Sequence, residues 1–381
     1  MKIGIVTCFN MKNVNYGNRL QAFALNRYLR NQSSDYHVET LQFSGFKSSL
    51  WTKDKHFIQT LIGRAAGKLS RMLSRDEELD PVLTGRLSNC NDFSERNIVL
   101  SKKLDLNGFI HSDYDVLITG SDIVWHQKPN VYRPLMFLDY ELANPVKRIA
   151  YAASFGKDYI PESNKRYIKK ALDRFSAISV REKSSVALLN GIGVEHVSHC
   201  IDPTLLLDPA EWRTVEKEPA SDKKPGSDFM FVYLLGDKKE DRESIRSVAD
   251  RMNLQIVNVP FARGKTNRAD EHFGDIQMMD CSPEEWLWLI DHSKYVITDS
   301  FHGVAFSTIF EKPFVIVGRE EFGINNRLHD YLKNICQEDK FTDISSVRDL
   351  SGFVWDYNSI KTNIDRMKNE SERFLKNALQ A

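Results

Sequence analysis

The sequence lacks an excess of charge of either sign. Lys plus Arg and Asp plus Glu each number 52 among 381 residues, so the formal net charge is zero. A broad basic surface of the kind that binds nucleic acid is therefore not expected. Local sites for small anions remain compatible with this balance.

Long hydrophobic runs are also missing. No stretch approaches the roughly 20 apolar residues that cross a bilayer, and the chain passes from its first apolar residues to Asn10 without the apolar segment of a signal peptide. We therefore expect a cytoplasmic protein. Residues 53–75 carry apolar residues at helical spacing with basic residues between them. They fit either a helix docked on its own domain or a peripheral contact with the inner face of a membrane.

Cysteine is scarce and scattered. The five cysteines lie far apart, and no two have the Cys-x-x-Cys spacing of a zinc or redox site. We expect reduced, mostly buried thiols and no bound metal.

Short apolar runs alternate with helical patterns along the chain. This alternation is typical of βαβ units and a mainly parallel sheet. The predicted strands are Lys2–Cys8, Val38–Phe43, Val116–Thr119, Arg148–Ala152, Ala177–Arg181, Phe229–Leu235, Gln255–Val259, Tyr295–Thr298 and Phe314–Val317.

A polar segment rich in turn residues, 215–228, interrupts this series. We predict two Rossmann-like α/β domains facing a cleft, residues 1–214 and 229–358, joined by this linker. Residues 359–381 form a C-terminal helix that we expect either to pack back across the first domain or to mediate self-association.

The most informative stretch is residues 295–303, where a strand pattern ends in Asp-Ser-Phe-His-Gly and a helical pattern begins. The carboxyl ends of parallel strands face the ligand crevice, and the following helix N-terminus attracts anions. His302 can exchange a proton near neutral pH at such a site. The alternative is an ordinary capped turn in which His302 has no chemical role.

Six segments together resemble the polysaccharide pyruvyl transferase family. They occur in the family's order and span roughly residues 1 to 330. The segments are Asn15-Tyr-Gly-Asn-Arg-Leu-Gln21, Asp115-Val-Leu-Ile-Thr-Gly-Ser-Asp-Ile-Val-Trp125, Tyr151-Ala-Ala-Ser-Phe-Gly156, Ile178-Ser-Val-Arg-Glu182, Cys200-Ile-Asp-Pro-Thr204 and Thr298-Asp-Ser-Phe-His-Gly303.

The resemblance implies a fold similar to the GT-B glycosyltransferases and a reaction with phosphoenolpyruvate as co-substrate and no other cofactor. The pyruvyl group would pass to two hydroxyls of a sugar in a bacterial cell-surface polysaccharide or its lipid-linked precursor, forming a ketal and releasing phosphate. The resemblance makes His302 the general acid that protonates the donor's methylene carbon. It also implies a donor site in the second domain and an acceptor site in the first.

The resemblance implies Arg181, Ser300 and Gly303 as donor residues, and Arg327 is expected to join them. Some family members have Arg-Leu-His where this chain has Ser-Phe-His, and Phe301 cannot replace a guanidinium. Arg327 is the candidate replacement, and Arg19 is another. Without the resemblance, Arg181 would be expected to pair with Glu182 and Arg327 to lie on a helix surface.

A second group is expected at the acceptor side or along the cleft. Asp122 fits either a base for a sugar hydroxyl or a helix cap, and Trp125 either stacks on a sugar or packs in the core. Asp202, before Pro203, is expected to be structural. The full group is Tyr16, Gly17, Asn18, Arg19, Gln21, Ser121, Asp122, Trp125 and Ser154.

Two other functions fit the same pattern. A GT-B glycosyltransferase using a nucleotide sugar would have the same architecture, because fold does not fix function. A non-catalytic carbohydrate-binding protein would retain its activity after His302→Ala.

Overall fold

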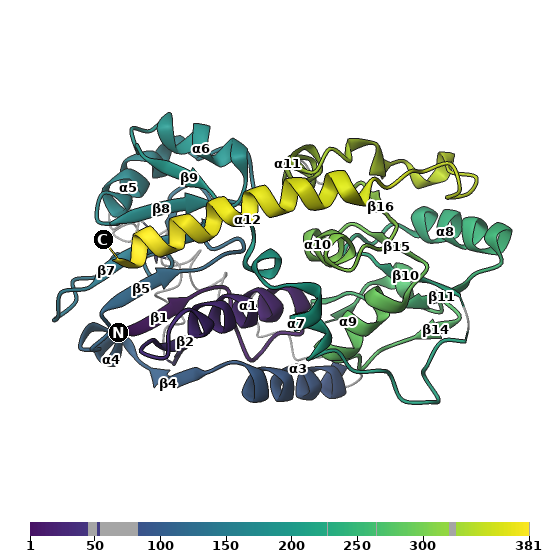
Figure 1. The fold of residues 1–381 in the computed structure, drawn as a ribbon, viewed down its shortest axis with the longest axis horizontal. Helices are drawn as coiled ribbons and strands as arrows, with labels where there is room; N and C mark the ends of the chain where they lie inside the picture. The colour runs from purple at the N-terminus through teal and green to yellow at the C-terminus, as the bar shows by residue number, and fades with distance from the viewer. Residues whose placement is uncertain (45–51, 54–82, 227, 264, 320–324, 381) are drawn as a thin grey trace, which may run out of the picture.

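The computed structural model describes residues 1–44, 52–53, 83–226, 228–263, 265–319 and 325–380. It contains two parallel sheets with helices packed against them (Figure 1), which confirms the predicted α/β class. The predicted helix over residues 53–75 lies outside the described residues, apart from Lys53. Among the described helices, none is long and apolar enough to cross a membrane.

The first sheet has seven strands in the order β4-β2-β1-β5-β7-β8-β9, and every neighbouring pair is parallel. The five strands predicted for this half of the chain are confirmed, while β4 and β9 were not predicted. The strands are β1 (Lys2–Val6), β2 (His37–Phe43), β4 (Leu100–Leu104), β5 (Val116–Thr119), β7 (Lys147–Ala153), β8 (Ala177–Val180) and β9 (Val197–His199).

The second sheet has six strands in the order β14-β11-β10-β15-β16-β17, again parallel throughout. Its four central strands were predicted, and the two-residue edge strands were not. The strands are β10 (Phe229–Tyr233), β11 (Gln255–Asn258), β14 (Ile276–Gln277), β15 (Tyr295–Thr298), β16 (Phe314–Val317) and β17 (Phe341–Thr342). Short antiparallel pairs join β3 (Thr52–Lys53) to β6 (Val131–Tyr132) and β12 (Ala262–Arg263) to β13 (Lys265–Thr266).

Helices connect the strands. In α9, Ser282 Oγ accepts a hydrogen bond from Glu285 N at 3.1 Å, and Ser282 N donates to Glu285 Oε2 at 2.8 Å, which closes a capping box. The described α-helices are α1 (Tyr16–Gln32), α3 (Thr84–Asn97), α4 (Leu106–Ile110), α5 (Glu162–Leu172), α6 (Lys183–Asn190), α7 (Pro209–Arg213), α8 (Lys239–Met252), α9 (Pro283–His292), α10 (Phe301–Ile309), α11 (Asn326–Asn334) and α12 (Tyr357–Gln380).

The C-terminal helix α12 runs from the second sheet back across the first (Figure 1). Ser371 Oγ accepts a hydrogen bond from Ile201 N at 3.0 Å, and the Phe374 ring lies 6.4 Å from the Tyr151 ring. The helix therefore packs on the first domain, one of the two arrangements expected for it. The predicted linker, residues 215–228, falls between α7 and β10.

One hydrophobic cluster includes residues from both sheets. Tyr16 of α1 stacks on Trp286 of α9 with ring centroids 5.5 Å apart. Arg86 of α3 donates to the carbonyl oxygens of Pro260, Met278 and Met279 at 2.6, 3.0 and 2.7 Å. These contacts hold the two halves of the molecule together.

Candidate active site

A cavity of about 530 Å³ lies where the two sheets face one another. Helix α1 follows β1 and helix α10 follows β15, and the first residues of both helices line this cavity. Backbone N–H groups at a helix N-terminus favour anions, so the two ends create a place for negative charge. The lining residues from these ends are Asn15, Gly17, Asn18, Ser300, Phe301 and His302.

Cations dominate the charged side chains of the cavity wall. Lys128, Arg133, Arg319 and Arg327 line it, against a single described carboxylate, Asp122. Among the described residues, the Nε atoms of Arg319 and Arg327 have no hydrogen-bond partner. Burial, with a further effect of nearby Arg181, lowers the pKa of Arg327 to about 10, so this side chain is still a cation at neutral pH.

His302 lies at the cavity wall and is 7% exposed. Its Nε2 atom is 3.7 Å from Asp202 Oδ2. On the other side the ring packs on α1, because a Cβ atom added to Gly17 would lie 2.1 Å from His302 Nδ1. Gly17 therefore allows the imidazole to reach its position, with Nε2 toward the carboxylate and Nδ1 toward α1.

Asp202 is fully buried behind His302 and accepts several hydrogen bonds. The donors are Arg181 Nη1 at 2.8 Å, Ser121 Oγ at 3.0 Å, and Thr204 through its backbone N–H and its hydroxyl. Burial acts to raise the pKa of this carboxyl, but His302 and Arg181 outweigh it and hold the pKa well below the ordinary value. Asp202 is therefore a buried carboxylate that faces the His302 ring at a distance too long for a hydrogen bond.

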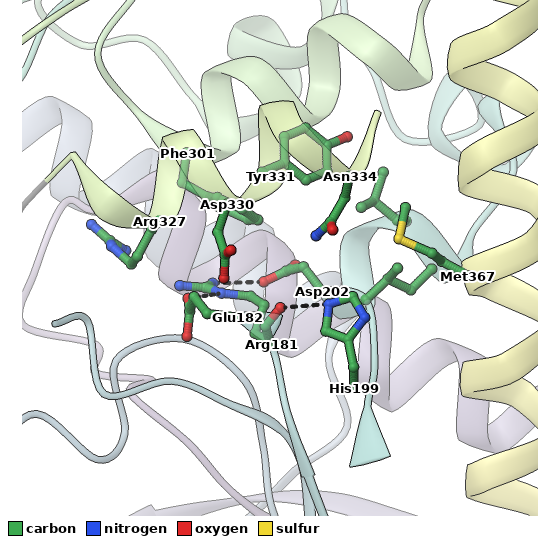
Figure 2. Close-up of a pocket in the computed structure, with 12 residues that line it drawn as sticks. Arg181, Glu182, His199, Asp202, Phe301, Arg327, Asp330, Tyr331, Asn334 and Met367 are labelled. Atoms are coloured by element: carbon green, nitrogen blue, oxygen red, sulfur yellow. Dashed lines mark hydrogen bonds and ion pairs between the residues drawn. The ribbon is translucent and has the colours of Figure 1, made fainter. Parts of the chain in front are cut away.

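Arg181 lies behind Phe301 and is not among the described residues that line the cavity. Its guanidinium carbon is 4.2 Å from the centroid of the Phe301 ring. It lines a small enclosed pocket of about 10 Å³ instead, where it hydrogen-bonds to Asp202 and Glu182 (Figure 2). The phenyl ring of Phe301 therefore lies between Arg181 and this cavity, and the role of Arg181 in donor binding stays a prediction.

The model of the family described as polysaccharide pyruvyl transferase matches residues 15–321. The chain belongs to this family. No curated protein sequence matches the chain.

Solved structures with the same fold are very distant in sequence. A putative UDP-N-acetylglucosamine 2-epimerase from Listeria monocytogenes is 11% identical with a TM-score of 0.50, covering 97% of this chain and 91% of that one. Another UDP-N-acetylglucosamine 2-epimerase is 12% identical with a TM-score of 0.50, covering 100% and 95%. An Escherichia coli heptosyltransferase with ADP is 12% identical with a TM-score of 0.40, covering 96% and 100%. The likeness to the two epimerases and the two parallel sheets at one cavity give this pyruvyl transferase family member a fold of the GT-B type, as expected.

Asp122 reaches the cavity from an unusual backbone conformation. Its φ is 67°, a left-handed value that non-glycine residues seldom adopt. Its carboxylate accepts a short hydrogen bond from Asn18 Nδ2 and lies 3.8 Å from Arg181 Nη1. No helix begins at Asp122, so its interpretation as a helix cap is wrong.

Two residues of α1 expected at the cleft point into the core. Tyr16 donates its hydroxyl to the Cys281 carbonyl at 2.8 Å. Arg19 is 0% exposed and donates to Ser94 Oγ at 2.6 Å and to the Asn13 carbonyl at 2.7 Å, which turns it toward α3. Arg19 therefore does not supply the missing donor cation.

Gln21 and Trp125 also lie away from the cavity. Gln21 donates to Thr7 Oγ1 at 2.9 Å. Trp125 stacks on Phe137 and donates its indole N–H to the Met136 carbonyl at 3.1 Å. The packing interpretation of Trp125 is the correct one.

The remaining predicted residues lie at the cavity or directly behind it. Ser300 lines the cavity. Ser154 is buried and donates to Glu182 Oε1 at 2.8 Å, as Ser121 does to Asp202. A Cβ atom at Gly303 would lie 2.6 Å from Thr298 Oγ1, so this glycine lets α10 pack closely on β15.

Several lining residues were not predicted. Arg319 follows the carboxyl end of β16. The rule that strand ends face the ligand crevice, which predicted His302 at the cavity, therefore applies to Arg319 as well. The indole Nε1 of Trp286 is buried without a partner among the described residues. The sequence carries no signal for Lys128 or Arg133, which lie between β5 and β7. Among the described residues, the one group with metal-ligand geometry is Glu216, Asp291 and His292, and none of these lines the cavity.

Proposed function

We propose that this protein transfers the pyruvyl group of phosphoenolpyruvate to two hydroxyls of a sugar in a bacterial cell-surface polysaccharide or its lipid-linked precursor. The products are a cyclic ketal and phosphate. Family membership supports the class of reaction, and the charges of the cavity support the donor.

The observation that carries the proposal is the pair of arginines, Arg319 and Arg327, at the wall that also holds His302. Neither Nε atom makes a hydrogen bond among the described residues, and Arg319 Nε is 3.5 Å from the nearest carboxylate oxygen that pairs with it, Asp299 Oδ2. Phosphoenolpyruvate carries a phosphate and a carboxylate. Guanidinium groups and a helix N-terminus bind such anions through charge-assisted hydrogen bonds. Arg319 and Arg327 thereby take over the binding role that Phe301 cannot fill.

In this proposal His302 acts as the general acid. Its imidazolium gives a proton to the methylene carbon of the donor, while the nearby Asp202 carboxylate stabilises the positive charge of the ring. The central carbon then becomes oxocarbenium-like, and a sugar hydroxyl attacks it and loses its proton.

Asp122 lies at the same cavity and is the candidate acceptor of that proton. Phosphate then leaves, and a second hydroxyl closes the ketal. One hydroxyl proton replaces the proton that His302 donated, and the other leaves with the phosphate. This scheme requires no metal.

Thermal unfolding with candidate ligands tests the donor assignment. A ligand that binds only the folded state raises the free energy of unfolding by about 2.7 kcal/mol at 100 times its Kd. We expect phosphoenolpyruvate to raise the Tm by several degrees. The shift should be lost in Arg327→Gln and kept in Arg366→Gln, a matched change at an exposed pair with Glu370 on α12. A shift with UDP, GDP or CMP sugars alone would favour the glycosyltransferase alternative.

A further inference from the structure

Asp299 is a buried carboxylate that the proposed chemistry does not use. It directly follows β15 and is 2% exposed. Its Oδ1 accepts a hydrogen bond from the backbone N–H of Leu235 at 2.7 Å, and its Oδ2 accepts one from that of Gly236 at 2.8 Å. Asp299 is not among the described residues that line the cavity. Any effect that it has on a ligand there must therefore pass through its neighbours.

The neighbours of Asp299 form a turn that is held from two sides. Leu235 and Gly236 follow β10 at its carboxyl end, and Leu235 lines the cavity. Asn267 Nδ2 donates to the carbonyl oxygens of the same two residues at 3.1 and 3.0 Å. Both N–H groups and both carbonyl groups of the turn are thus bonded to side chains, which fixes its backbone.

Arg319 packs against this turn. A Cβ atom added to Gly236 would be 3.3 Å from Arg319 Cγ and 3.2 Å from Asp299 Oδ2, so the glycine leaves room for both side chains. Arg319 Nε is 3.5 Å from Asp299 Oδ2, an ion pair without a hydrogen bond. Burial raises the pKa of the Asp299 carboxyl, and the charge of Arg319 acts against this rise. Asp299 therefore holds the turn by hydrogen bonds and attracts Arg319 by its charge.

We propose that Asp299 is a positioning residue: it holds the Leu235–Gly236 turn against the Arg319 side chain and thereby keeps this guanidinium in place at the cavity wall. The inference rests on the proposed function, in which Arg319 binds phosphoenolpyruvate. A cation whose side chain is already held loses less conformational freedom when the anion binds, and this raises the affinity for the donor.

The direction of the effect separates positioning from direct electrostatics. Asp299→Asn removes a negative charge from beside the anion site, and this change alone would strengthen donor binding. The new amide also places an N–H group against one of the two backbone N–H groups, so the turn loses a hydrogen bond and Arg319 loses its ion pair. If Asp299 positions Arg319, donor affinity should fall in spite of the change in charge.

Calorimetric titration of the full chain with phosphoenolpyruvate measures this effect in a double-mutant cycle. We expect the Kd to rise by about tenfold in Asp299→Asn and by about tenfold or more in Arg319→Gln. In the Arg319→Gln background, Asp299→Asn should no longer raise the Kd, because the side chain that it positions is gone.

Asp291→Asn is the matched control. The Asp291 carboxylate is buried, accepts hydrogen bonds from Arg213 at 2.7 and 3.0 Å, and is not among the described residues that line the cavity. This substitution removes the same charge from an arginine pair of the same domain. It should change the Kd by less than about threefold.

NMR tests the link between Asp299 and Arg319 without a ligand. The Arg319 Nε–H signal is assigned through its absence in Arg319→Gln. Its order parameter should fall in Asp299→Asn, because the side chain becomes mobile, and should keep the wild-type value in Asp291→Asn.

A Kd that stays the same or falls in Asp299→Asn overturns the proposal, as does an equal rise with and without Arg319. If phosphoenolpyruvate does not bind the wild type, the proposed function fails. An Arg319 signal that is equally ordered in the wild type and Asp299→Asn would show separately that Asp299 does not hold this side chain.

Gly236→Ala tests the same turn if Asp299→Asn does not fold. Its Cβ atom displaces the Arg319 side chain, so the Kd should rise by about threefold or more, while Gly352→Ala leaves it unchanged. An unchanged Kd in Gly236→Ala would then contradict the positioning role.

Discussion

At the scale of single residues, the site depends on the close fit of the His302 imidazole between Gly17 and Asp202. The backbone of Gly17 is helical, so its conformation does not require glycine. Glycine is needed because a Cβ atom at this position would be 2.1 Å from His302 Nδ1. The ring is wedged between α1 and the Asp202 carboxylate. Small changes on either side should therefore alter chemistry more than stability.

Gly17→Ala should displace His302 and lower turnover by about 100-fold, the usual scale for a mispositioned catalytic group. Stability should fall little, because the displaced ring can move into the cavity that it lines. Gly352→Ala, with no atom within 4 Å of the added Cβ, is the control. Turnover and thermal unfolding are measured for both. Wild-type turnover in Gly17→Ala would show that the His302 position is not needed.

Asp202→Asn should lower stability in a pH-dependent way. The folded-state pKa of Asp202 is depressed, so its contribution to stability is fully present above the unfolded pKa of about 3.9 and is lost as pH falls toward the folded pKa. The difference in unfolding free energy between wild type and Asp202→Asn should be constant from pH 7 to about 5 and shrink below about 4. Denaturant titrations across this range measure it, and a difference that grows on acidification would contradict the ion-pair network.

At the scale of elements, the prediction of strands and helices is most accurate where the local residue pattern determines the structure. The strands β1 and β15 are apolar runs that end in polar turns, and these signals located α1, α10 and the cavity between them. The strand β4, Leu-Ser-Lys-Lys-Leu, was not predicted, because its two exposed lysines suit a sheet edge but interrupt the apolar pattern of a strand.

The direction of a side chain was less predictable than its element. Arg19 lies one helical turn or less from Gly17 and Asn18, yet it faces α3, because Ser94 and the Asn13 carbonyl accept its hydrogen bonds. Arg181 was placed correctly at the end of β8, but its cover by Phe301 depends on α10 from the other domain. Such contacts join distant parts of the chain, so composition and spacing cannot reveal them.

Helix α12 offers a test at this scale. Ser371 Oγ accepts the Ile201 N–H, one residue before Asp202, and both groups are buried. Ser371→Ala leaves this N–H unpaired and should cost about 1–3 kcal/mol of unfolding free energy. Asn369→Ala, on the exposed face of the same helix, should change it by less than about 0.5 kcal/mol. Equal effects of the two changes in urea titrations would mean that α12 does not stabilise the Asp202 loop.

At the scale of the whole molecule, the two sheets share one hydrophobic cluster. Tyr16, Trp286 and Arg86 connect them across the base of the cavity. Although two α/β units are predicted from the sequence, this shared core couples their unfolding. The shape of the cavity is therefore fixed by interdomain packing as well as by each domain alone.

Calorimetry should accordingly show a single unfolding transition for the wild type. Arg86→Ala leaves three carbonyl groups of the second domain without their donor, two of them in buried contacts, and should lower the unfolding free energy by about 3 kcal/mol or more. Arg366→Ala, at an exposed helix pair, should have an effect below about 1 kcal/mol. Two well-separated transitions in the wild type would contradict the coupling of the domains.

The measurement that tests the central claim most directly is transfer of carbon-13-labelled pyruvyl from phosphoenolpyruvate to a panel of sugar glycosides and polysaccharide fragments. NMR would follow the products alongside phosphate release. We predict a ketal methyl signal on one acceptor, formed in equal amount to the phosphate and absent with His302→Gln. Transfer of a sugar from a nucleotide sugar by the same preparation, with no ketal formed on any acceptor, would contradict the account.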